Sequence, residues 1–236
     1  MSNAFVDQLR SRAAISSEAQ EQLRVSTSRV SPIAMHSHIV RQRDTPVGSF
    51  ALLSGWACCY TSSANGSRQI IRLMMAGDYW ESHPDVSFEL DYGIAALTSA
   101  QVAFIPASAV KHLLLPHADI ALALYRTRVR DEAITRTWLS RLARRDAMTV
   151  LTHLLCELCV RAGKSTGEIT MPLPLTQTVL ADATAMTAVH LNRILKLCRE
   201  RELCSLQQGI LRVKNYETLA SAAGFAPTYL RTKMSA

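Results

Sequence analysis

The sequence predicts an α+β fold in which an N-terminal antiparallel β-roll is followed by a long helix and a C-terminal domain of short helices with a β-hairpin. Three observations predict it. Short β-prone runs separated by turn residues occupy residues 34–106, as is typical of small antiparallel barrels and rolls. No glycine or proline interrupts residues 118–142. Two short helical segments with capping residues lie between residues 176 and 199, and capping residues are the local signal for helix starts.

The composition is that of a folded protein. Of the 236 residues, 48% are hydrophobic and 19% are charged, which excludes disorder of the low-hydrophobicity, high-charge kind. No run of about 18 apolar residues occurs, so we expect no membrane span. The first ten residues lack a basic start followed by an apolar stretch, so we expect no secretory signal and a cytoplasmic location.

Positive charge is concentrated in the C-terminal part of the chain. The net charge is +7. Residues 141–236 carry 13 Lys and Arg against 7 Asp and Glu, whereas residues 1–140 carry 13 against 12. A basic excess confined to one part of a chain is typical of a surface that meets a polyanion.

The N-terminal half is expected to form the roll. Residues 1–28 have mixed polarity and predict one or two short helices that form a peripheral segment. Asn65-Gly66 separates two β-prone runs, and this dipeptide is a strong hairpin signal because both residues tolerate positive φ. The expected strands lie at residues 50–55, 56–60, 69–74, 93–97 and 101–106.

The uninterrupted stretch at residues 118–142 predicts one long helix. Its length is common where two subunits lie side by side, so we expect dimerisation through it. Thr127 and Asp131 interrupt the apolar seam, and we expect Arg126, Arg128 and Arg130 to form a solvated face. The residues of the expected apolar face are Ile120, Leu124, Ile134, Trp138 and Leu142.

A second helix is expected at residues 146–162, ended by Gly163. It contains Cys156 and Cys159, which share one helical face. Core packing explains this pair best, because buried thiols behave as small hydrophobic groups and no second ligand pair at zinc-like spacing is visible. A sensor or metal role is the alternative. Cys58 and Cys59 are neighbours on a strand, so we expect only one of them to point inward. Without a secretory signal, reduced thiols are expected.

The C-terminal segment predicts a helix-turn-helix. A short helix at residues 176–183 is followed by a turn at 184–186, and Thr187 is a good N-cap for a helix at 188–199. Residues 203–205 and 209–213 then predict a small hairpin, or wing. The expected inward face of the second helix is Leu191, Ile194, Leu195 and Cys198. Its expected outward face is Ala188, Val189, His190, Asn192, Arg193 and Lys196.

This outward face suits the major groove of duplex DNA. Arginine can bind guanine O6 and N7, and asparagine can pair with adenine N6 and N7. A capped second helix that exposes Asn192 and Arg193 is the arrangement in which a helix-turn-helix reads base edges. The sequence therefore predicts a double-stranded DNA partner.

Several motifs resemble the Crp/Fnr transcription regulators over residues 30–230. In the C-terminal part they are Asp146-Ala147, His153-Leu154-Leu155-Cys156-Glu157-Leu158, Leu173-Pro174-Leu175-Thr176-Gln177, Leu180-Ala181-Asp182-Ala183, Val189-His190-Leu191-Asn192-Arg193 and Leu219-Ala220 followed by Ala223-Gly224-Phe225. In the N-terminal part they are Leu53-Ser54-Gly55-Trp56-Ala57, Asn65-Gly66-Ser67-Arg68-Gln69-Ile70 and Gly77-Asp78.

The resemblance implies a cyclic-nucleotide-binding-type β-roll (a cupin-like double-stranded β-helix), a dimerisation helix and a C-terminal winged helix-turn-helix. The corresponding domains are residues 1–115, 116–143 and 144–236. It further implies that Thr176 and Gln177 lie at the DNA backbone. The positions at or beside the bases are Ala188, Val189, His190, Asn192 and Arg193, and Thr187 and Lys196 complete the expected DNA-binding set.

The chain departs from the family pattern in three places. The family's cyclic-nucleotide cassette uses an arginine for the phosphate, but no arginine lies between Arg72 and Arg126, and residues 79–95 carry four acidic side chains. An anionic phosphate would be repelled there, so cyclic AMP is not expected as the effector, which stays unknown. No cysteine precedes Cys58, so the N-terminal iron–sulfur ligands of oxygen-sensing members are missing. Ala185 replaces the glycine that is usual in the turn between the helices.

We therefore expect a transcription regulator that binds a pseudo-palindromic DNA site as a homodimer, with RNA polymerase as a possible further partner. The alternative is a thiol- or metal-responsive sensor switched by Cys156 and Cys159 or by Cys58. An enzyme is not expected, because there is no nucleophile–base spacing, Gly-rich phosphate loop or metal-ligand set. Accordingly we expect no catalytic residue, no cofactor and no metal site.

Overall fold

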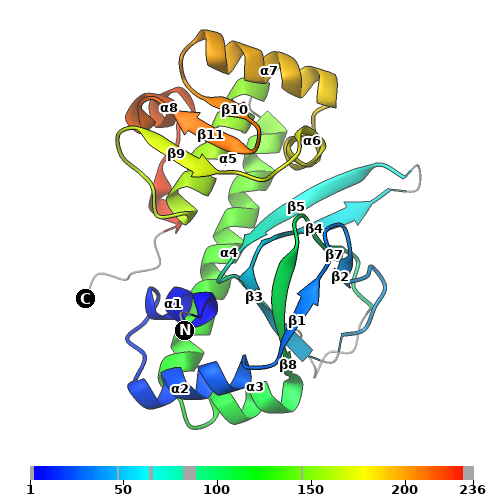
Figure 1. The fold of residues 1–236 in the computed structure, drawn as a ribbon, viewed down its shortest axis with the longest axis vertical. Helices are drawn as coiled ribbons and strands as arrows, with labels where there is room; N and C mark the ends of the chain where they lie inside the picture. The colour runs from blue at the N-terminus through cyan, green and yellow to red at the C-terminus, as the bar shows by residue number, and fades with distance from the viewer. Residues whose placement is uncertain (1–2, 47, 64–65, 82–88, 145, 231–236) are drawn as a thin grey trace. The chain divides into compact units, whose positions relative to one another are not determined.

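The computed structural model describes residues 3–46, 48–63, 66–81, 89–144 and 146–230. The chain divides into two compact units, an N-terminal unit up to Asp131 and a C-terminal unit from Glu132. Figure 1 labels their helices and strands. None of the described helices combines the length and apolar character needed to cross a membrane.

The N-terminal unit contains two four-stranded antiparallel sheets, as expected for a roll. Their strand orders are β1-β8-β3-β6 and β2-β7-β4-β5. Three short strands were not predicted: β1, β2 and β6. The Asn65 of the expected hairpin lies outside the described residues, but β4 and β5 pair as expected. The strands are β1 Val30–Ile33, β2 His38–Val40, β3 Gly48–Ser54, β4 Trp56–Ser62, β5 Arg68–Met75, β6 Tyr79–Trp80, β7 Gly93–Ala96 and β8 Ala100–Pro106.

The alternating side chains of both sheets build the roll core. Phe50 and Trp80 stack with ring centroids 5.6 Å apart, and the Trp80 indole N–H donates to the Tyr92 hydroxyl at 2.8 Å. Cys58 and Cys59 point to opposite faces of β4, yet both are buried. The two cysteines do lie on opposite faces of the strand, as expected. The expectation that only one of them would point inward is wrong, because both faces of this sheet are covered.

Three helices of the N-terminal unit form a second core against the roll: α1 Ala4–Arg10, α2 Ser17–Ser26 and α3 Ala107–Leu114. Phe5 and Leu9 are buried together with Tyr79 and Ile120, and the Phe5 and Tyr79 rings stack at 5.3 Å. The interpretation of residues 1–28 as peripheral was wrong, because one face of each helix is part of the core. Helix α3 was not predicted.

The long helix α4, Ala118–Arg144, was predicted nearly to its ends. Its expected apolar face packs within its own chain. Ile120, Ile134 and Trp138 are each at most 3% exposed. The expectation that this face forms the seam between subunits is wrong, because these side chains complete the chain's own cores.

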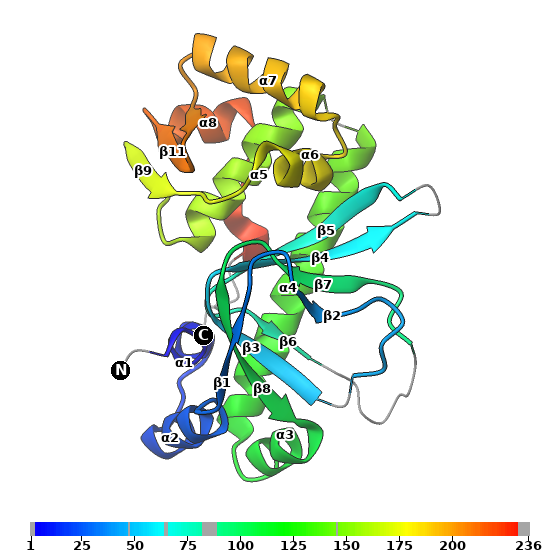
Figure 2. The ribbon, with the colours of Figure 1, turned by 45° about the vertical axis from the view of Figure 1, so that its right-hand side comes forward.

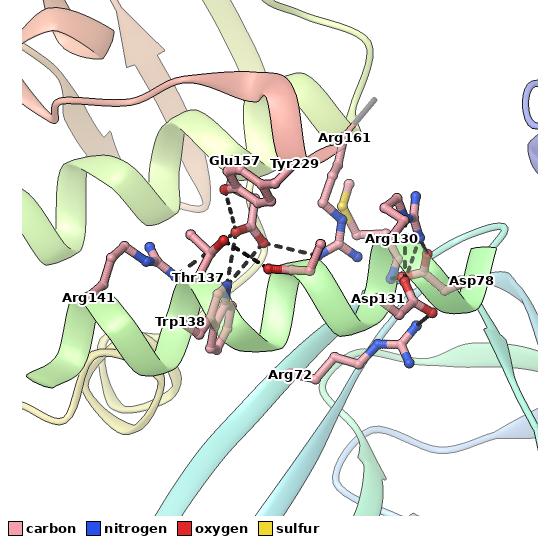
Figure 3. A network of polar contacts seen from close by, with 12 residues as sticks. Arg72, Asp78, Arg130, Asp131, Thr137, Trp138, Arg141, Glu157, Arg161 and Tyr229 are labelled. Atoms are coloured by element: carbon pink, nitrogen blue, oxygen red, sulfur yellow. Dashed lines mark hydrogen bonds and ion pairs between the residues drawn. The ribbon is translucent and has the colours of Figure 1, made fainter. Parts of the chain in front are cut away.

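Arg130 on α4 is buried rather than solvated, which corrects the expected solvated face. Its Nη2 lies 3.1 Å from Asp78 Oδ1 and 3.0 Å from Asp131 Oδ1, and Arg72 Nη2 lies 2.6 Å from Asp131 Oδ2 (Figure 3). Burial alone would lower the pKa of Arg130, but the two carboxylates outweigh burial and raise it. The network ties α4 to strand β5 and the turn after it.

The other two arginines of the series behave differently. Arg126 is half-buried and donates to the Arg12 carbonyl oxygen at 2.7 Å. Arg128 has a side chain 64% exposed and lies 3.7 Å from Glu81. Only Arg128 is thus the solvated arginine that the sequence predicted.

The C-terminal unit contains the predicted helix-turn-helix and wing (Figure 2). Strands β10, β11 and β9 form one three-stranded antiparallel sheet in that order. The wing begins at Ser205 rather than at residue 203. The remaining elements are α5 Ala147–Arg161, β9 Ile169–Pro172, α6 Gln177–Thr184, α7 Ala188–Glu200, β10 Ser205–Gln207, β11 Ile210–Val213, α8 Tyr216–Ala222 and η1 Pro227–Leu230.

We predict that Arg130→Ala lowers the free energy of unfolding by about 3–5 kcal/mol, because it leaves the buried Asp78 carboxylate without its cation and Asp131 with Arg72 alone. Urea denaturation followed by circular dichroism measures this. The matched control is Arg128→Ala, two residues along the same helix, which should change stability by less than about 0.5 kcal/mol. Equal effects of the two substitutions would contradict the assignment of the network.

Candidate DNA-binding surface

Capping side chains set the bounds of both helices of the helix-turn-helix. Thr176 Oγ1 accepts a hydrogen bond from the Val179 backbone N–H at 3.2 Å, and Thr187 Oγ1 accepts one from the His190 N–H at 3.2 Å. Each cap satisfies a backbone donor that a helix start leaves without an intrahelical partner. Both threonines thus have a structural role at the starts of α6 and α7.

Ala185 makes the turn between α6 and α7. It adopts the left-handed conformation with φ of +53°, and the Met186 N–H donates to the Ala181 carbonyl at 3.0 Å. This conformation favours glycine, because a Cβ crowds the following carbonyl oxygen. The turn that the family usually builds with glycine is therefore kept here with alanine.

Helix α7 is amphipathic. Leu191, Ile194 and Cys198 are buried, and the helix contacts α5, α6 and β10. Leu195, which was expected to point inward with them, is only half-buried. The apolar side of α7 therefore lies against the rest of the C-terminal unit, and the opposite side is left in solvent.

Most of the expected DNA-binding side chains lie on the solvent side. His190 is the exception, because it is half-buried at the edge of the outward face. Val189 is 75% exposed. The exposed members of the set are Thr176, Gln177, Thr187, Ala188, Val189, Asn192, Arg193 and Lys196.

Some of the expected DNA-binding residues line two hollows, whereas Thr176, Ala188, Val189 and Arg193 line neither. Gln177, Asn192 and Lys196 line one of about 190 Å³, together with Arg199 of α7 and Gln207 of β10. Sequence reasoning missed Arg199 and Gln207, although Arg199 lies seven residues after Asn192, on the same helical face. This hollow joins the start of α6, the outward side of α7 and the wing.

The second hollow, of about 470 Å³, lies near the start of α7. Thr187 and His190 line it with Leu142 of α4, Val150 of α5 and Met186. The His190 side chain is thus directed partly toward the body of its own unit. It differs in this respect from Asn192 and Lys196.

A tight reversal carries the chain from α7 into the wing. The Leu203 N–H donates to the Cys198 carbonyl at 2.9 Å, and the Glu202 N–H donates to the Arg199 carbonyl at 3.0 Å. This pair of bonds is the Schellman arrangement, with Glu202 in the left-handed position at φ of +56°. Lys214 Nζ lies 2.6 Å from Glu202 Oε1 and links the reversal to the segment after β11.

A buried carboxylate binds several polar side chains in the core of the C-terminal unit. Glu157 of α5 is fully buried and accepts from the Trp138 indole N–H at 3.0 Å and from the Tyr229 hydroxyl at 2.9 Å (Figure 3). Arg161 Nη1 lies 3.5 Å from it and Arg141 Nη2 lies 4.0 Å from it. Sequence reasoning missed Glu157, because it lies within an otherwise apolar run.

Cys156 and Cys159 are buried in α5, as core packing predicts. Burial raises the pKa of the Cys156 thiol, and it raises that of Cys159 to about 11. Within the described ranges, no group of three or more His, Cys, Asp and Glu side chains is arranged to hold a metal ion.

The N-terminal unit contains an open cavity of about 880 Å³ between α2, strands β1 to β3 and β8. Apolar side chains and hydroxyl groups line it, among them Val25, Ser49 and Phe104, together with the charged Arg29 and Asp44. Val25 and Phe104 are 59% and 45% exposed. Among the described residues that line it, none belongs to α4.

We predict that Ala185→Gly raises the free energy of unfolding by about 0.5–1 kcal/mol, because glycine adopts positive φ without the cost of a Cβ. Thermal and urea unfolding measure this. The control, Ala183→Gly in the last turn of α6, should instead lose about 1 kcal/mol, because glycine disfavours helix. A loss of stability in Ala185→Gly would show that the turn does not strain alanine.

Comparisons with known proteins agree with this architecture. Residues 32–117 match the cyclic nucleotide-binding domain family, and residues 151–222 match the Crp-like helix-turn-helix domain family. The chain is 28% identical over 187 residues to a probable transcriptional regulator, flp, of Lacticaseibacillus casei, covering 76% of this chain and 81% of that protein.

Solved structures share the fold. FixK2 from Bradyrhizobium japonicum superposes with a TM-score of 0.72 at 17% identity, over 82% of this chain and 96% of that one. A CRP-family transcriptional regulator from Thermus thermophilus superposes with a TM-score of 0.66 at 17% identity, over 86% and 100% of the two chains. With a cyclic nucleotide-binding domain followed by a Crp-like helix-turn-helix domain, the chain belongs to the Crp/Fnr family of DNA-binding transcription regulators.

Proposed function

We propose that the protein binds a pseudo-palindromic duplex site as a homodimer and reads bases with the outward side of α7. The observation that carries the proposal is the division of α7 into a buried apolar side and an exposed side that presents Asn192 and Arg193. A recognition helix needs this division, because its base-reading groups must remain available while its other side fixes its position.

The expected roles follow from side-chain chemistry. Arg193 would contact guanine and Asn192 adenine, whereas Ala188 and the exposed Val189 would contact a thymine methyl group. Phosphate contacts, which position the protein without specifying sequence, fall to the polar and basic side chains around them. These are Thr176, Gln177, Thr187 and Lys196, with His190 at the edge of the contact.

Arg193→Ala should reduce discrimination at one base pair of each half-site by about 1–3 kcal/mol, because a bidentate base contact is lost. Lys196→Ala should instead weaken binding to all sequences and reduce the salt dependence by about one charge. Selection of a DNA site, followed by fluorescence anisotropy on the selected site and its single-base variants, measures both effects.

The control for these two variants is Arg10→Ala, which removes an exposed positive charge from α1 in the N-terminal unit. It should leave affinity and base preference unchanged. An Arg193→Ala protein with the base preference of the parent would contradict the assigned role of Arg193.

We propose that the homodimer forms through the side of α4 opposite the one first expected. Large apolar side chains are exposed there: Leu122 is 43%, Tyr125 65%, Val129 39% and Leu139 71% exposed. With Glu132 and Arg136, whose side chains pair at 3.1 Å, they repeat at spacings of three and four residues. This repeat, here called the outer stripe, has the spacing of a coiled-coil seam.

Leu122→Asp should yield a monomer at concentrations at which the parent protein is a dimer, because it places a charge in each copy of an apolar seam. Sedimentation equilibrium measures the subunit assembly. The matched control is Leu115→Asp, because Leu115 is 85% exposed but precedes α4. A dimeric Leu122→Asp protein, or an equally disrupted Leu115→Asp protein, would refute the role of the outer stripe.

We propose further that the effector domain, residues 1–115, does not respond to cyclic AMP. Arg72, the last arginine before Arg126, is already paired with Asp131 inside the unit. The cavity of about 880 Å³ has the size of a small-molecule site, and its lining combines apolar side chains with hydroxyl groups and the opposite charges of Arg29 and Asp44. Calorimetric titration with cyclic AMP should give no heat of binding, and saturable binding at micromolar concentrations would contradict this.

In the same proposal, residues 116–143 would serve dimerisation and residues 144–236 would serve DNA binding.

A further inference from the structure

A small pocket of the C-terminal unit is lined by basic and hydroxyl side chains. Its volume is about 280 Å³, and residues of α4, α5 and η1 form its walls. None of the described residues that line it is acidic, and none belongs to the expected DNA-binding set. Its polar lining residues are Arg136, Thr137, Ser140, Arg141, His153 and Tyr229.

Arg141 brings a positive charge to this pocket from the core. Its side chain is only 5% exposed, yet it lines the pocket. Its Nη2 lies 4.0 Å from Glu157 Oε2, which is farther than a hydrogen bond reaches. Glu157 binds Trp138 and Tyr229 more closely, at 3.0 and 2.9 Å (Figure 3). An arginine has five N–H donors, so Arg141 can bind an anion in the pocket while Glu157 keeps these two partners.

Arg136 supplies a second guanidinium group to the pocket from the surface. Its side chain is 62% exposed, and its Nη1 lies 3.1 Å from Glu132 Oε1. An exposed ion pair between residues four apart on a helix is weak, so Arg136 can turn from Glu132 to an anion at little cost. Ser140 lies four residues after Arg136, on the same face of α4, and its hydroxyl group is exposed.

His153 lines the pocket from α5. It is 4% exposed, and its ring packs edge-on against Phe225 at 4.8 Å and stacks with Tyr229 at 6.0 Å. The two aromatic rings fix the position of the imidazole, which carries an N–H donor in either tautomer. The Tyr229 hydroxyl donates to Glu157 Oε2, so this wall of the pocket is also held in place.

This set of donors suits a phosphate group. It combines guanidinium, imidazole and hydroxyl groups from two helices. A planar carboxylate can be bound by the fork of one arginine, whereas the oxygens of a tetrahedral phosphate point in several directions and use several donors. The volume lies just below the range of pockets for drug-sized ligands, roughly 300–1,000 Å³, so the occupant must be small.

We propose that the pocket binds the phosphate group of a small anion, either inorganic phosphate or a phosphomonoester of similar size. The anion would bridge Arg136 and Arg141 of α4 to His153 of α5 and so stabilise the C-terminal unit. This site is separate from the DNA-binding surface, and its occupancy does not depend on the proposed function.

The experiment uses the full chain in phosphate-free buffer at constant ionic strength. Calorimetric titration with inorganic phosphate, and separately with glycerol 3-phosphate, should show saturable binding of one anion per chain. At about one hundred times the dissociation constant, the midpoint of thermal unfolding should rise by about 5 °C. The tighter ligand of the two identifies the source of the phosphate group, and saturable binding of neither would overturn the proposal.

A pair of substitutions at Ser140 tests the location. Ser140→Asp should abolish binding, because it places a carboxylate at the pocket, and Ser140→Asn should keep the affinity of the parent. Because Ser140 is exposed, both variants should fold. Unchanged phosphate affinity in Ser140→Asp, or equal loss in the two variants, would refute the site.

Two arginine variants test the donors. Arg141→Lys, which keeps the charge but loses the fork, and Arg136→Gln should each weaken binding about tenfold. The matched control is Arg128→Gln, whose parent side chain is 64% exposed on the same helix and which should keep full affinity. An equal loss in this control would refute the role of Arg136. Since Arg136 also belongs to the outer stripe, sedimentation equilibrium reads any change in assembly separately.

Discussion

The burial of one side of α7 is the constraint on which the DNA-binding surface depends. Leu191, Ile194 and Cys198 fix the rotation of the helix about its axis, and the Thr187 cap fixes where it starts. Together they decide which side chains reach solvent. These contacts are apolar, and the free energy that they contribute is roughly proportional to the area that they bury. A polar residue at any of the three positions would therefore disturb the whole surface at once.

The helix-turn-helix could be predicted because its signals are local. Thr176 and Thr187 cap helices within three residues of themselves, and the inward face of α7 follows from helical periodicity. Leu195 is the exception: periodicity places it near the inward side, but the hollow beside the wing leaves it half-buried. The shape of a neighbouring element is not encoded in the period of the helix itself.

Polar groups in the cores could not be predicted, because their partners are distant in sequence. Arg130 is buried only because Asp78 lies 52 residues earlier in the chain and reaches it. Glu157 depends on Trp138 and Tyr229, which lie 19 and 72 residues away. The same holds for α1 and α2, whose mixed composition is typical of surface helices until the facing core is known. The sequence pattern of α4 located its apolar side but could not say whether the chain or a second subunit covers it.

Helix α4 belongs to two cores, because its residues up to Asp131 pack in one compact unit and those from Glu132 in the other. An isolated DNA-binding fragment for crystallography or spectroscopy should therefore begin within this helix, near residue 132. A fragment cut at residue 147, where α5 begins, would retain the Glu157 carboxylate but lose the Trp138 indole that it binds. A boundary chosen from secondary structure alone would thus expose a charge that the intact chain keeps buried.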